Sequence, residues 1–270
     1  MSSSSQQLLF ASSNIFSAVA LQSGSNGNCI YVQAGNSHLF FDAGISGIEA
    51  QRRFAVHQMS VPSQAALFIS HDHSDHTRCA GVFHRKFGVD LYMTHPTWHA
   101  LHSRNRLGRL RHVNFFKGGQ TVCLNDVSVE TIPTPHDGVD GVAFVVEYGQ
   151  KRLGILTDLG HPFDGLEEIV CDLDGVFLES NYDVDMLRDG PYPYVLKKRI
   201  SDPSGHISNT EAAHLLKAAF ARRLKWAVLS HLSGENNTPE LALETHRRIV
   251  GTDKSIFVAR RNEVSGIFSL

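Results

Sequence analysis

A run of four potential metal ligands within six residues is the feature that most constrains this chain. The run follows directly after the apolar stretch 65–70, which predicts a buried strand. On a tight loop, spacings of two, two and one residues let such side chains converge on one point. Imidazoles beside a carboxylate suit Zn, Mn or Fe, whereas a calcium site needs mostly oxygen ligands. The sequence therefore predicts a transition-metal site at the end of a strand. Its residues are His71, His73, Asp75 and His76.

The composition agrees with a metal-binding globular protein. Histidine accounts for 16 of 270 residues, and imidazole is both a common metal ligand and the side chain that titrates near neutral pH. A hydrophobic content of 42% and a charged content of 19% exclude a disordered or collagen-like chain. The net charge of −2 creates no global field that would attract nucleic acid. Basic runs at 104–112 and 197–199 are either solvated surface or contacts to phosphate groups, and the sequence leaves both interpretations open.

The cysteines indicate the compartment. Four of them, at positions 29, 79, 123 and 171, lie too far apart for a C-x-x-C pair or a dense disulfide framework, which predicts reduced thiols and a cytoplasmic location. No segment has the charged start of a signal peptide or the roughly 18 apolar residues of a membrane span, so we expect no membrane partner. We also infer no obligate protein partner. The expected organisation is a flexible Ser-rich tail over 1–16 and one domain over 17–270.

Short apolar stretches separated by glycine and proline turns predict many strands and two groups of helices. The segment that contains Pro191, Pro193 and Pro203 is expected to form turns. Together these elements predict an α/β (α+β) fold with two sheets packed face to face and helices outside, in four layers. Strands are predicted at 17–22, 29–34, 38–42, 65–70, 90–94, 127–132, 142–148, 152–157, 175–179, 226–230, 256–259 and 266–269. Helices are predicted at 45–59, 78–87, 96–104, 162–170, 209–223 and 239–250.

The cluster at 71–76 matches the pattern H-x-H-x-D-H and resembles the signature of the metallo-β-lactamase superfamily. The resemblance implies an αββα sandwich with a two-metal site at the edge of the sheets. It also implies further ligands downstream, and three residues at the ends of predicted strands fit: His136, Asp158 and His231. Each of the three, taken alone, is equally explained as an ordinary polar residue at the end of a strand. Their order along the chain favours the metal site.

The resemblance implies two divalent cations, Zn or Mn, held by seven side chains. A hydroxide that bridges the two cations would be the nucleophile, so no Ser or Cys nucleophile is required. Asp42 is a candidate to orient a ligand histidine, because such ligands commonly donate their other N–H to a carboxylate. An Asx-turn at 42–44 is the alternative role of Asp42. In the implied arrangement one metal is held by His71, His73 and His136, and the other by Asp75, His76 and His231. Asp158 bridges the two metals. Asp75 and Asp158 therefore count among the predicted catalytic residues.

Six further stretches resemble one branch of that superfamily, the YycJ (WalJ) group of compact nuclease-like hydrolases. Two positions differ from the pattern of the group: Tyr182 stands where a histidine is frequent, and the stretch 202–204 is substituted. Neither is a predicted ligand. The 48 residues that separate Asp158 from His206 are too few for a β-CASP domain, which implies a single domain without that insertion. The six stretches are 22–29, 41–44, 178–183, 192–200, 204–209 and 230–237.

His206 is the catalytic residue that we predict outside the metal site. The sequence Ser204, Gly205, His206 resembles a motif of the β-CASP nucleases that places an imidazole on the scissile phosphate. A protonated histidine there would contact the substrate and either stabilise developing charge or protonate the leaving oxygen. The alternative is that His206 caps the following helix or bonds to the backbone. Further predicted substrate contacts are Ser23, Asn181 and Lys197, with Ser25 and Asn28 as additional donors near the metals; a β-turn role is the alternative for residues 23–28.

The YycJ resemblance implies a 5′→3′ exonuclease whose partner is nucleic acid, with DNA favoured over RNA. A hydrolase of small phosphodiesters, or of acyl and lactone substrates, is the alternative, because the same metal site supports several chemistries. A metal-binding protein without hydrolytic activity is disfavoured, since every expected ligand is present. His206 and the basic runs favour a nuclease over an acyl hydrolase. The near-neutral net charge keeps the small phosphodiester alternative open.

Overall fold

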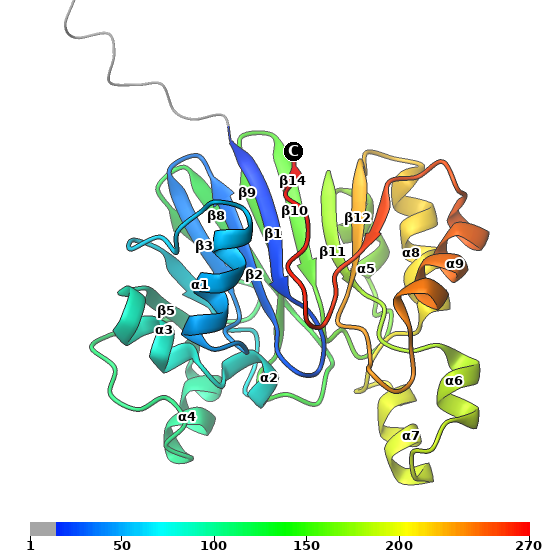
Figure 1. The fold of residues 1–270 in the computed structure, drawn as a ribbon, viewed down its shortest axis with the longest axis horizontal. Helices are drawn as coiled ribbons and strands as arrows, with labels where there is room; N and C mark the ends of the chain where they lie inside the picture. The colour runs from blue at the N-terminus through cyan, green and yellow to red at the C-terminus, as the bar shows by residue number, and fades with distance from the viewer. Residues whose placement is uncertain (1–14) are drawn as a thin grey trace, which may run out of the picture.

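Two seven-stranded sheets pack face to face in the computed structural model, which describes residues 15–270 (Figure 1). The first sheet has the strand order β14-β1-β2-β3-β4-β5-β6 and the second has the order β13-β12-β11-β10-β9-β8-β7. The strands of the first sheet are β1 (Phe16–Gln22), β2 (Cys29–Ala34), β3 (Ser37–Phe41), β4 (Ala66–Phe68), β5 (Asp90–Thr94), β6 (Val113–Phe116) and β14 (Phe268–Ser269). Those of the second are β7 (Thr121–Leu124), β8 (Val127–Pro133), β9 (Val142–Tyr148), β10 (Lys151–Leu156), β11 (Gly175–Glu179), β12 (Trp226–Ser230) and β13 (Ile256–Val258).

Helices cover the outer faces of the two sheets (Figure 1). In chain order they are α1 (Gly47–Val56), α2 (Ser74–Thr77), α3 (Ala80–Phe87), α4 (His95–Ser103), α5 (Leu166–Cys171), α6 (Val184–Asp189), α7 (Tyr194–Ser201), α8 (Asn209–Phe220) and α9 (Pro239–Val250). The first sheet buries apolar side chains against α1, α3 and α4, and the second against α5, α8 and α9. A third apolar layer lies between the sheets. The predicted four-layer sandwich is therefore confirmed.

Aromatic side chains join the two sheets. The ring of Phe41 lies 5.6 Å from that of Phe68 and 5.0 Å from that of Phe144, and all three side chains are buried. Phe41 and Phe68 belong to the first sheet and Phe144 to the second. Burial of a side chain of this size contributes about 1.5–3 kcal/mol, so this layer of aromatic contacts fixes how the two sheets face each other.

The direction of the strands decides where the functional residues meet. Strands β3 to β6 run parallel in the first sheet, and β10 to β13 run parallel in the second. Strand β8 points the same way as β10, because both are antiparallel to β9. The carboxyl ends of parallel strands lie at one edge of a sheet, where ligand sites of α/β folds occur. The predicted ligands all follow such strand ends.

The expectation of turns around Pro191 is wrong for much of that segment, which contains α6 and α7. The Asp183 carboxylate accepts the backbone N–H groups of Asp185 and Met186 and so begins α6. The sequence of α7 lacks the apolar periodicity that predicts a helix, because no residue of this helix is buried and none has to be apolar. The predicted metal loop likewise contains the one-turn helix α2.

The first described strand begins at Phe16, one residue before the predicted strand. Phe16 is buried and pairs with Ala34 of β2, so the predicted tail ends earlier than residue 16. Residues 1–14 of that tail lie outside the described residues. The division into a tail and a domain otherwise stays a prediction.

All four cysteines are unpaired in the structure, and only Cys29 is buried. The cytoplasmic location stays a prediction. Over residues 15–270, no helix combines the length and the apolar character that crossing a membrane requires.

Candidate metal centre

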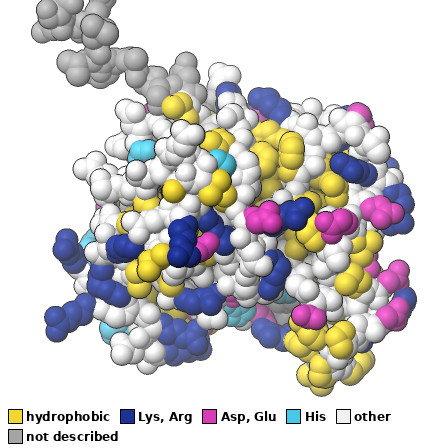
Figure 2. Space-filling model, viewed as in Figure 1, with side chains coloured by type: hydrophobic (Ala, Val, Ile, Leu, Met, Phe, Trp, Pro, Cys, Tyr) yellow, Lys and Arg dark blue, Asp and Glu magenta, His cyan; other side chains and the backbone are white. Residues whose placement is uncertain are grey.

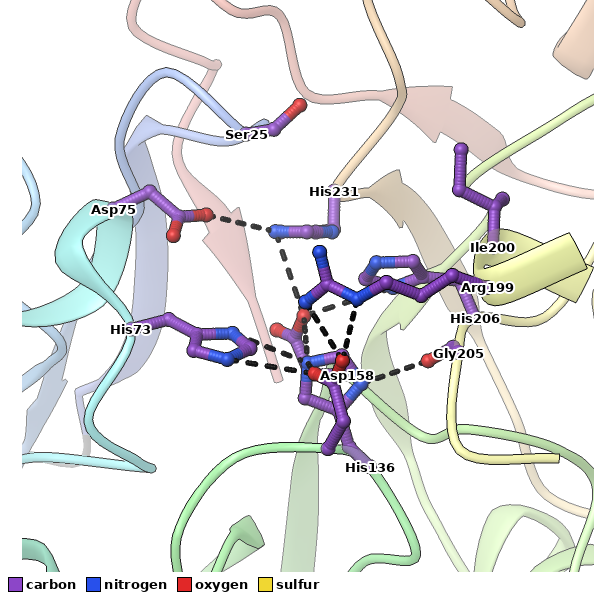
Figure 3. Close-up of a pocket in the computed structure, with 11 residues that line it drawn as sticks. Ser25, His73, Asp75, His136, Asp158, Arg199, Ile200, Gly205, His206 and His231 are labelled. Atoms are coloured by element: carbon purple, nitrogen blue, oxygen red, sulfur yellow. Dashed lines mark hydrogen bonds and ion pairs between the residues drawn. The ribbon is translucent and has the colours of Figure 1, made fainter. Parts of the chain in front are cut away.

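A pocket of about 190 Å³ lies where strand ends of the two sheets meet (Figure 3). It brings together side chains that are far apart in the sequence. Asp75 belongs to α2 after β4, Asp158 follows β10, and His231 directly follows β12. The residues that line the pocket are Ser25, His73, Asp75, His136, Asp137, Asp158, Arg199, Ile200, Gly205, His206 and His231.

Three residues that follow strands adopt the left-handed backbone conformation, which is uncommon for residues other than glycine. The φ angle is 62° at Asp42, 57° at Asp158 and 55° at His231. Each such residue costs on the order of 1–3 kcal/mol, and such strain concentrates at functional sites. In Figure 3 the side chains of Asp158 and His231 point into the pocket from the ends of their strands. The sharp turns after β3, β10 and β12 thus direct polar side chains across the edge of the sandwich.

The seven predicted ligands lie close enough together to bind metal ions. Within each of several groups, the candidate ligand atoms all lie within 4.8 Å of one another. Asp158 lies between the groups: its Oδ2 is 3.3 Å from Nε2 of His76, and its Oδ1 is 3.6 Å from Nε2 of both His136 and His231. This position suits a carboxylate shared by two ions. The groups are His71 with His73 and His136, Asp75 with His76 and His231, His71 with His76 and Asp158, and a fourth in which Asp158 and His231 meet Glu179 and His206.

Unpaired buried atoms support the same site. Nε2 of His71 is buried and has no hydrogen-bond partner among residues 15–270, and Oδ2 of Asp158 makes no hydrogen bond there either, although it lies 3.3 Å from Nε2 of His76. Leaving a buried polar atom unpaired costs about 1–3 kcal/mol, and more for a charged group. A bound cation would remove this cost, because it takes the lone pairs that both atoms offer. The donor set of imidazoles and carboxylates fits a divalent transition metal.

Residues behind the pocket hold the imidazole rings in place. Oδ2 of Asp42 lies 2.7 Å from Nδ1 of His76, and the same carboxylate accepts the N–H of Ser70 at 2.8 Å. Nδ1–H of His136 donates to the carbonyl oxygen of Gly205 at 2.7 Å. These contacts leave Nε2 of His136 at the pocket and Nε2 of His76 toward the carboxylates of Asp75 and Asp158, each 3.3 Å away. Asp42 therefore lies where the orienting role requires, and its carboxylate contacts His76 and Ser70 instead of closing an Asx-turn.

The electrostatic environment favours the protonation state that a metal ligand needs at Asp75 and His71, but not at His76. Burial raises the pKa of Asp75, but the imidazoles of His76 and His231 outweigh burial and bring it well below its ordinary value. Burial lowers the pKa of His71, which keeps that ring neutral. Burial also lowers the pKa of His76, but Asp158, Asp42 and Asp75 raise it well above its ordinary value. His76 thus holds a proton that a metal ion would displace, which couples metal binding to proton release.

His206 lies beside the ligand groups and contacts a buried carboxylate. Its Nδ1 is 2.6 Å from Oε1 of Glu179, and Oε2 of Glu179 accepts the N–H of Leu159 at 2.8 Å. Burial lowers the pKa of His206, but the neighbouring Glu179 outweighs burial, so the pKa is raised. The hydroxyl of Ser208 caps helix α8, so the alternative in which His206 caps that helix is wrong.

Glu179 is the residue that the sequence interpretation missed. It is fully buried at the end of β11, and its Oε1 also lies 3.8 Å from Nδ1 of His231. A signal was available, because Glu179 ends a predicted apolar strand, just as Asp158 and His231 follow theirs. A charged residue at such a position has no reason to be buried unless it has a partner.

Three residues that were predicted to contact the substrate, Ser23, Asn181 and Lys197, do not line the pocket, and their contact with a substrate stays a prediction. The hydroxyl of Ser23 accepts the N–H of His231 at 2.8 Å, and the amide of Asn181 donates to the carbonyl of His231, also at 2.8 Å. Both residues are buried and contact His231. Nζ of Lys197 donates to the carbonyl of Arg188 at 2.7 Å. Of the additional donors, Ser25 lines the pocket.

Arg199 takes the position that was expected of Lys197. The two residues lie about 200° apart around α7, because each residue of an α-helix advances by roughly 100°. Nε and Nη2 of Arg199 each lie 2.7 Å from Oδ2 of Asp137, whose Oδ1 is 3.4 Å from Nε2 of His73. Burial raises the pKa of Asp137, but Arg199 outweighs it, so Asp137 is ionised. A cation thus lines the pocket next to the predicted ligands.

The chain is similar to known proteins over most of its length. A family model described as "Beta-lactamase superfamily domain" matches residues 38–231. The chain belongs to the β-lactamase superfamily. It is 36% identical over 226 residues to the exodeoxyribonuclease WalJ of Streptococcus pneumoniae. The matched region covers 82% of this chain and 83% of the relative. It is 31% identical over 224 residues to the exodeoxyribonuclease YycJ of Bacillus anthracis, with 82% and 84% covered.

A solved structure shares the superfamily fold. The metallo-β-lactamase fold protein YhfI from Bacillus subtilis matches with a TM-score of 0.68 over 95% of this chain and 100% of that chain, at 15% identity. Membership of the metallo-β-lactamase superfamily, and of its WalJ and YycJ group, is therefore confirmed. The superfamily fold and the donor groups together indicate divalent metal ions. The assignment of single residues to single metals stays a prediction.

Proposed function

We propose that this β-lactamase superfamily protein is a 5′→3′ exodeoxyribonuclease that uses two divalent cations, Zn or Mn. The observation that carries the proposal is the pair of His206 and buried Glu179, 2.6 Å apart, at a pocket that also presents two groups of metal ligands. An acyl hydrolase of this superfamily needs the metals but has no phosphate for such an imidazole to contact. Similarity to two proteins named exodeoxyribonuclease supports DNA as the substrate.

The proposed ligands divide the work of holding the cations. When bound, the two cations lower the pKa of water and neutralise charge on a phosphodiester. The shared carboxylate of Asp158 keeps the two sites close together, and Asp42 holds the ring of His76 so that Nε2 faces inward. In this proposal His71, His73 and His136 form one site, and Asp75, His76 and His231 form the other.

His206 is the proposed proton donor. Its Nδ1–H donates to Glu179, so Nε2 is the nitrogen that is free to meet a substrate. The Glu179 carboxylate stabilises the protonated imidazole, which fits transfer of the proton from Nε2 to the oxygen that leaves when the P–O bond breaks. Arg199 contributes N–H donors for a phosphate oxygen at the same pocket. Its guanidinium already binds one anionic group there, the carboxylate of Asp137.

A comparison of substrates tests the proposal. Metal-loaded enzyme is incubated with 5′-labelled double-stranded DNA, single-stranded DNA, RNA and bis-p-nitrophenyl phosphate, in Mn²⁺ or Zn²⁺. The proposal expects mononucleotides to be released from the 5′ end of DNA, with RNA degraded more slowly. Hydrolysis of the small ester without shortening of any polymer would replace the nuclease with a small phosphodiesterase.

A single substitution tests the role of His206. His206→Ala should retain both metals, as counted by mass spectrometry, and lose DNA hydrolysis by about 10²–10⁴-fold. His214→Ala, an exposed histidine on α8, is the matched control and should leave both quantities unchanged. Loss of metal together with activity in His206→Ala would identify His206 as a ligand instead.

A further inference from the structure

A second concave surface, separate from the metal pocket, combines aromatic and basic side chains. This groove, of about 680 Å³, lies between α4, the segment 104–112 and β6. Trp98, His102 and Phe115 supply aromatic rings, and Arg109 and Arg111 supply positive charge. Figure 2 shows Lys and Arg side chains gathered on the left half of the molecule, over the region where Figure 1 places α3 and α4. None of these residues lines the metal pocket.

The aromatic rings of the groove are arranged for stacking. The rings of Trp98 and His102 lie 4.8 Å apart with an angle of 15° between their planes, and the ring of Phe115 meets Trp98 edge-on at 5.8 Å. Phe115 is 49% exposed, which is unusual for a phenylalanine on a sheet. Planar apolar surface that faces water next to cations favours a ligand that is itself flat and anionic.

The arginines of the groove have no acidic partner. Within residues 15–270, no carboxylate lies within 4.0 Å of Arg106, Arg109 or Arg111, whereas Nη1 of Arg104 is paired with Oδ2 of Asp72 at 2.9 Å. Arg106, Arg109 and Arg111 are all exposed. Their uncompensated charge is therefore free to bind phosphate groups, although the net charge of the whole chain is −2.

The groove adjoins the metal loop through α4. Thr97 Oγ1 donates to the carbonyl of Val139 at 2.8 Å, and the N–H of Val139 donates to Oδ1 of Asp72 at 2.9 Å. Asp72 lies between the predicted ligands His71 and His73. Since Trp98 and His102 line the groove from the adjacent side of the same helix, the groove begins about one helix diameter, roughly 10 Å, from the metal loop.

We propose that this groove binds a single-stranded segment of the DNA substrate, with bases stacked on Trp98, His102 and Phe115 and phosphates held by Arg109 and Arg111. The inference rests on the proposed function, because it concerns the part of the same substrate that lies beyond the cleavage site. Unpaired DNA is the occupant that fits, since the faces of paired bases are covered by their neighbours in the duplex. The separation of the groove from the metal loop corresponds to at most about three nucleotides, since roughly 3.4 Å per nucleotide is the rise of a fully stacked strand and an unpaired strand can be more extended.

Binding measurements on the metal-loaded enzyme test the groove. The probe is a fluorescein-labelled oligothymidine of about 16 nucleotides, with phosphorothioate linkages protecting both ends, read by fluorescence anisotropy. Trp98→Ala should raise Kd about 10-fold or more and leave its salt dependence unchanged, because stacking is not electrostatic. Arg109→Ala combined with Arg111→Ala should reduce the slope of log K against log salt by about 1.4, since each phosphate contact on a single strand contributes about 0.7.

Matched variants show whether the effect belongs to the groove. Arg247→Ala combined with Arg248→Ala removes two exposed charges from α9, on the opposite side of the sandwich, and should change neither Kd nor the slope. Phe115→Ser tests stacking at a more exposed position, in case Trp98→Ala impairs folding. A blunt duplex of the same length should lose less than about twofold in affinity in Trp98→Ala, since its bases are not available for stacking.

The outcomes separate the groove from the proposed function. Every groove variant should hydrolyse bis-p-nitrophenyl phosphate at the rate of the unmodified enzyme, because this ester is too small to reach the groove. Oligothymidine affinities within twofold of the unmodified enzyme in both the aromatic and the arginine variants would overturn the groove proposal, as would an equal loss in the α9 control or on the duplex. Failure of the unmodified enzyme to shorten any DNA would overturn the nuclease itself, whatever the groove binds.

Discussion

Replacing Glu179 by glutamine removes one negative charge from the side chain that holds His206 and changes little else. Glu179 is fully buried, and its Oε1 lies 2.6 Å from Nδ1 of His206. Glutamine keeps an oxygen for the N–H of Leu159, which Glu179 accepts at 2.8 Å, so the fold around β11 should persist. The new amide group, however, presents N–H donors to Nδ1 of His206. That contact favours the neutral ring with its proton on Nε2 and opposes the protonated imidazole.

The size of the effect follows from this contact. A hydrogen bond to a charged group contributes about 1.5–3 kcal/mol. If His206 protonates the leaving oxygen, DNA hydrolysis by Glu179→Gln should fall by about 10- to 150-fold. The pKa of His206 is raised by Glu179, so activity that needs the protonated ring is lost as pH rises through that pKa. The alkaline limb of the pH profile should therefore move to lower pH in the variant.

The assay compares two leaving groups on the same enzyme. DNA releases an alkoxide, which needs a proton, whereas bis-p-nitrophenyl phosphate releases p-nitrophenolate, which does not. The variant should thus lose less than about threefold on the small ester. Glu244→Gln, an exposed position on α9, is the control for the loss of one carboxylate. Equal losses on both substrates, or loss of metal by mass spectrometry, would refute the proton-donor role and leave Glu179 as a support of the site.

Three further predictions concern the shared ligand, the pocket arginine and a core histidine. Asp158→Ala should lose both tightly bound metals, and retention of two metals by mass spectrometry would contradict the shared carboxylate. Arg199→Ala should raise the KM for DNA about 10-fold, whereas Lys197→Ala should not, because Lys197 is bound to Arg188. Burial lowers the pKa of His246 to about 4, so as pH falls below about 6.5 the unfolded chain takes up a proton that the native state cannot. Urea unfolding should show about 2 kcal/mol less stability at pH 5 than at pH 7.5 from this residue, and His246→Gln should remove that difference; an unchanged difference would show that His246 is not responsible.

Apolar periodicity in the sequence suffices to predict most of the strands that carry the candidate site. The strands 29–34, 90–94, 142–148, 175–179 and 226–230 and the helix 239–250 have the bounds that apolar periodicity predicts. The spacing of residues along the chain was enough to predict the cluster at 71–76, because its members are neighbours in the sequence. The superfamily resemblance implied further ligands downstream, and His136, Asp158 and His231 fit them because parallel strand order brings residues that follow strands to one edge.

Contacts between side chains that are distant in the sequence depend on how the chain packs in three dimensions. Glu179 and His206 are 27 residues apart, and the carbonyl that orients His136 belongs to Gly205, 69 residues away. Periodicity cannot reveal such contacts, since they depend on how the segment before α8 lies against the end of β11. The same packing buries Asn181 and directs Arg199, instead of Lys197, into the pocket. Strand periodicity placed the predicted metal ligands, whereas packing between distant segments set the partner of the proposed proton donor and the proposed phosphate contact.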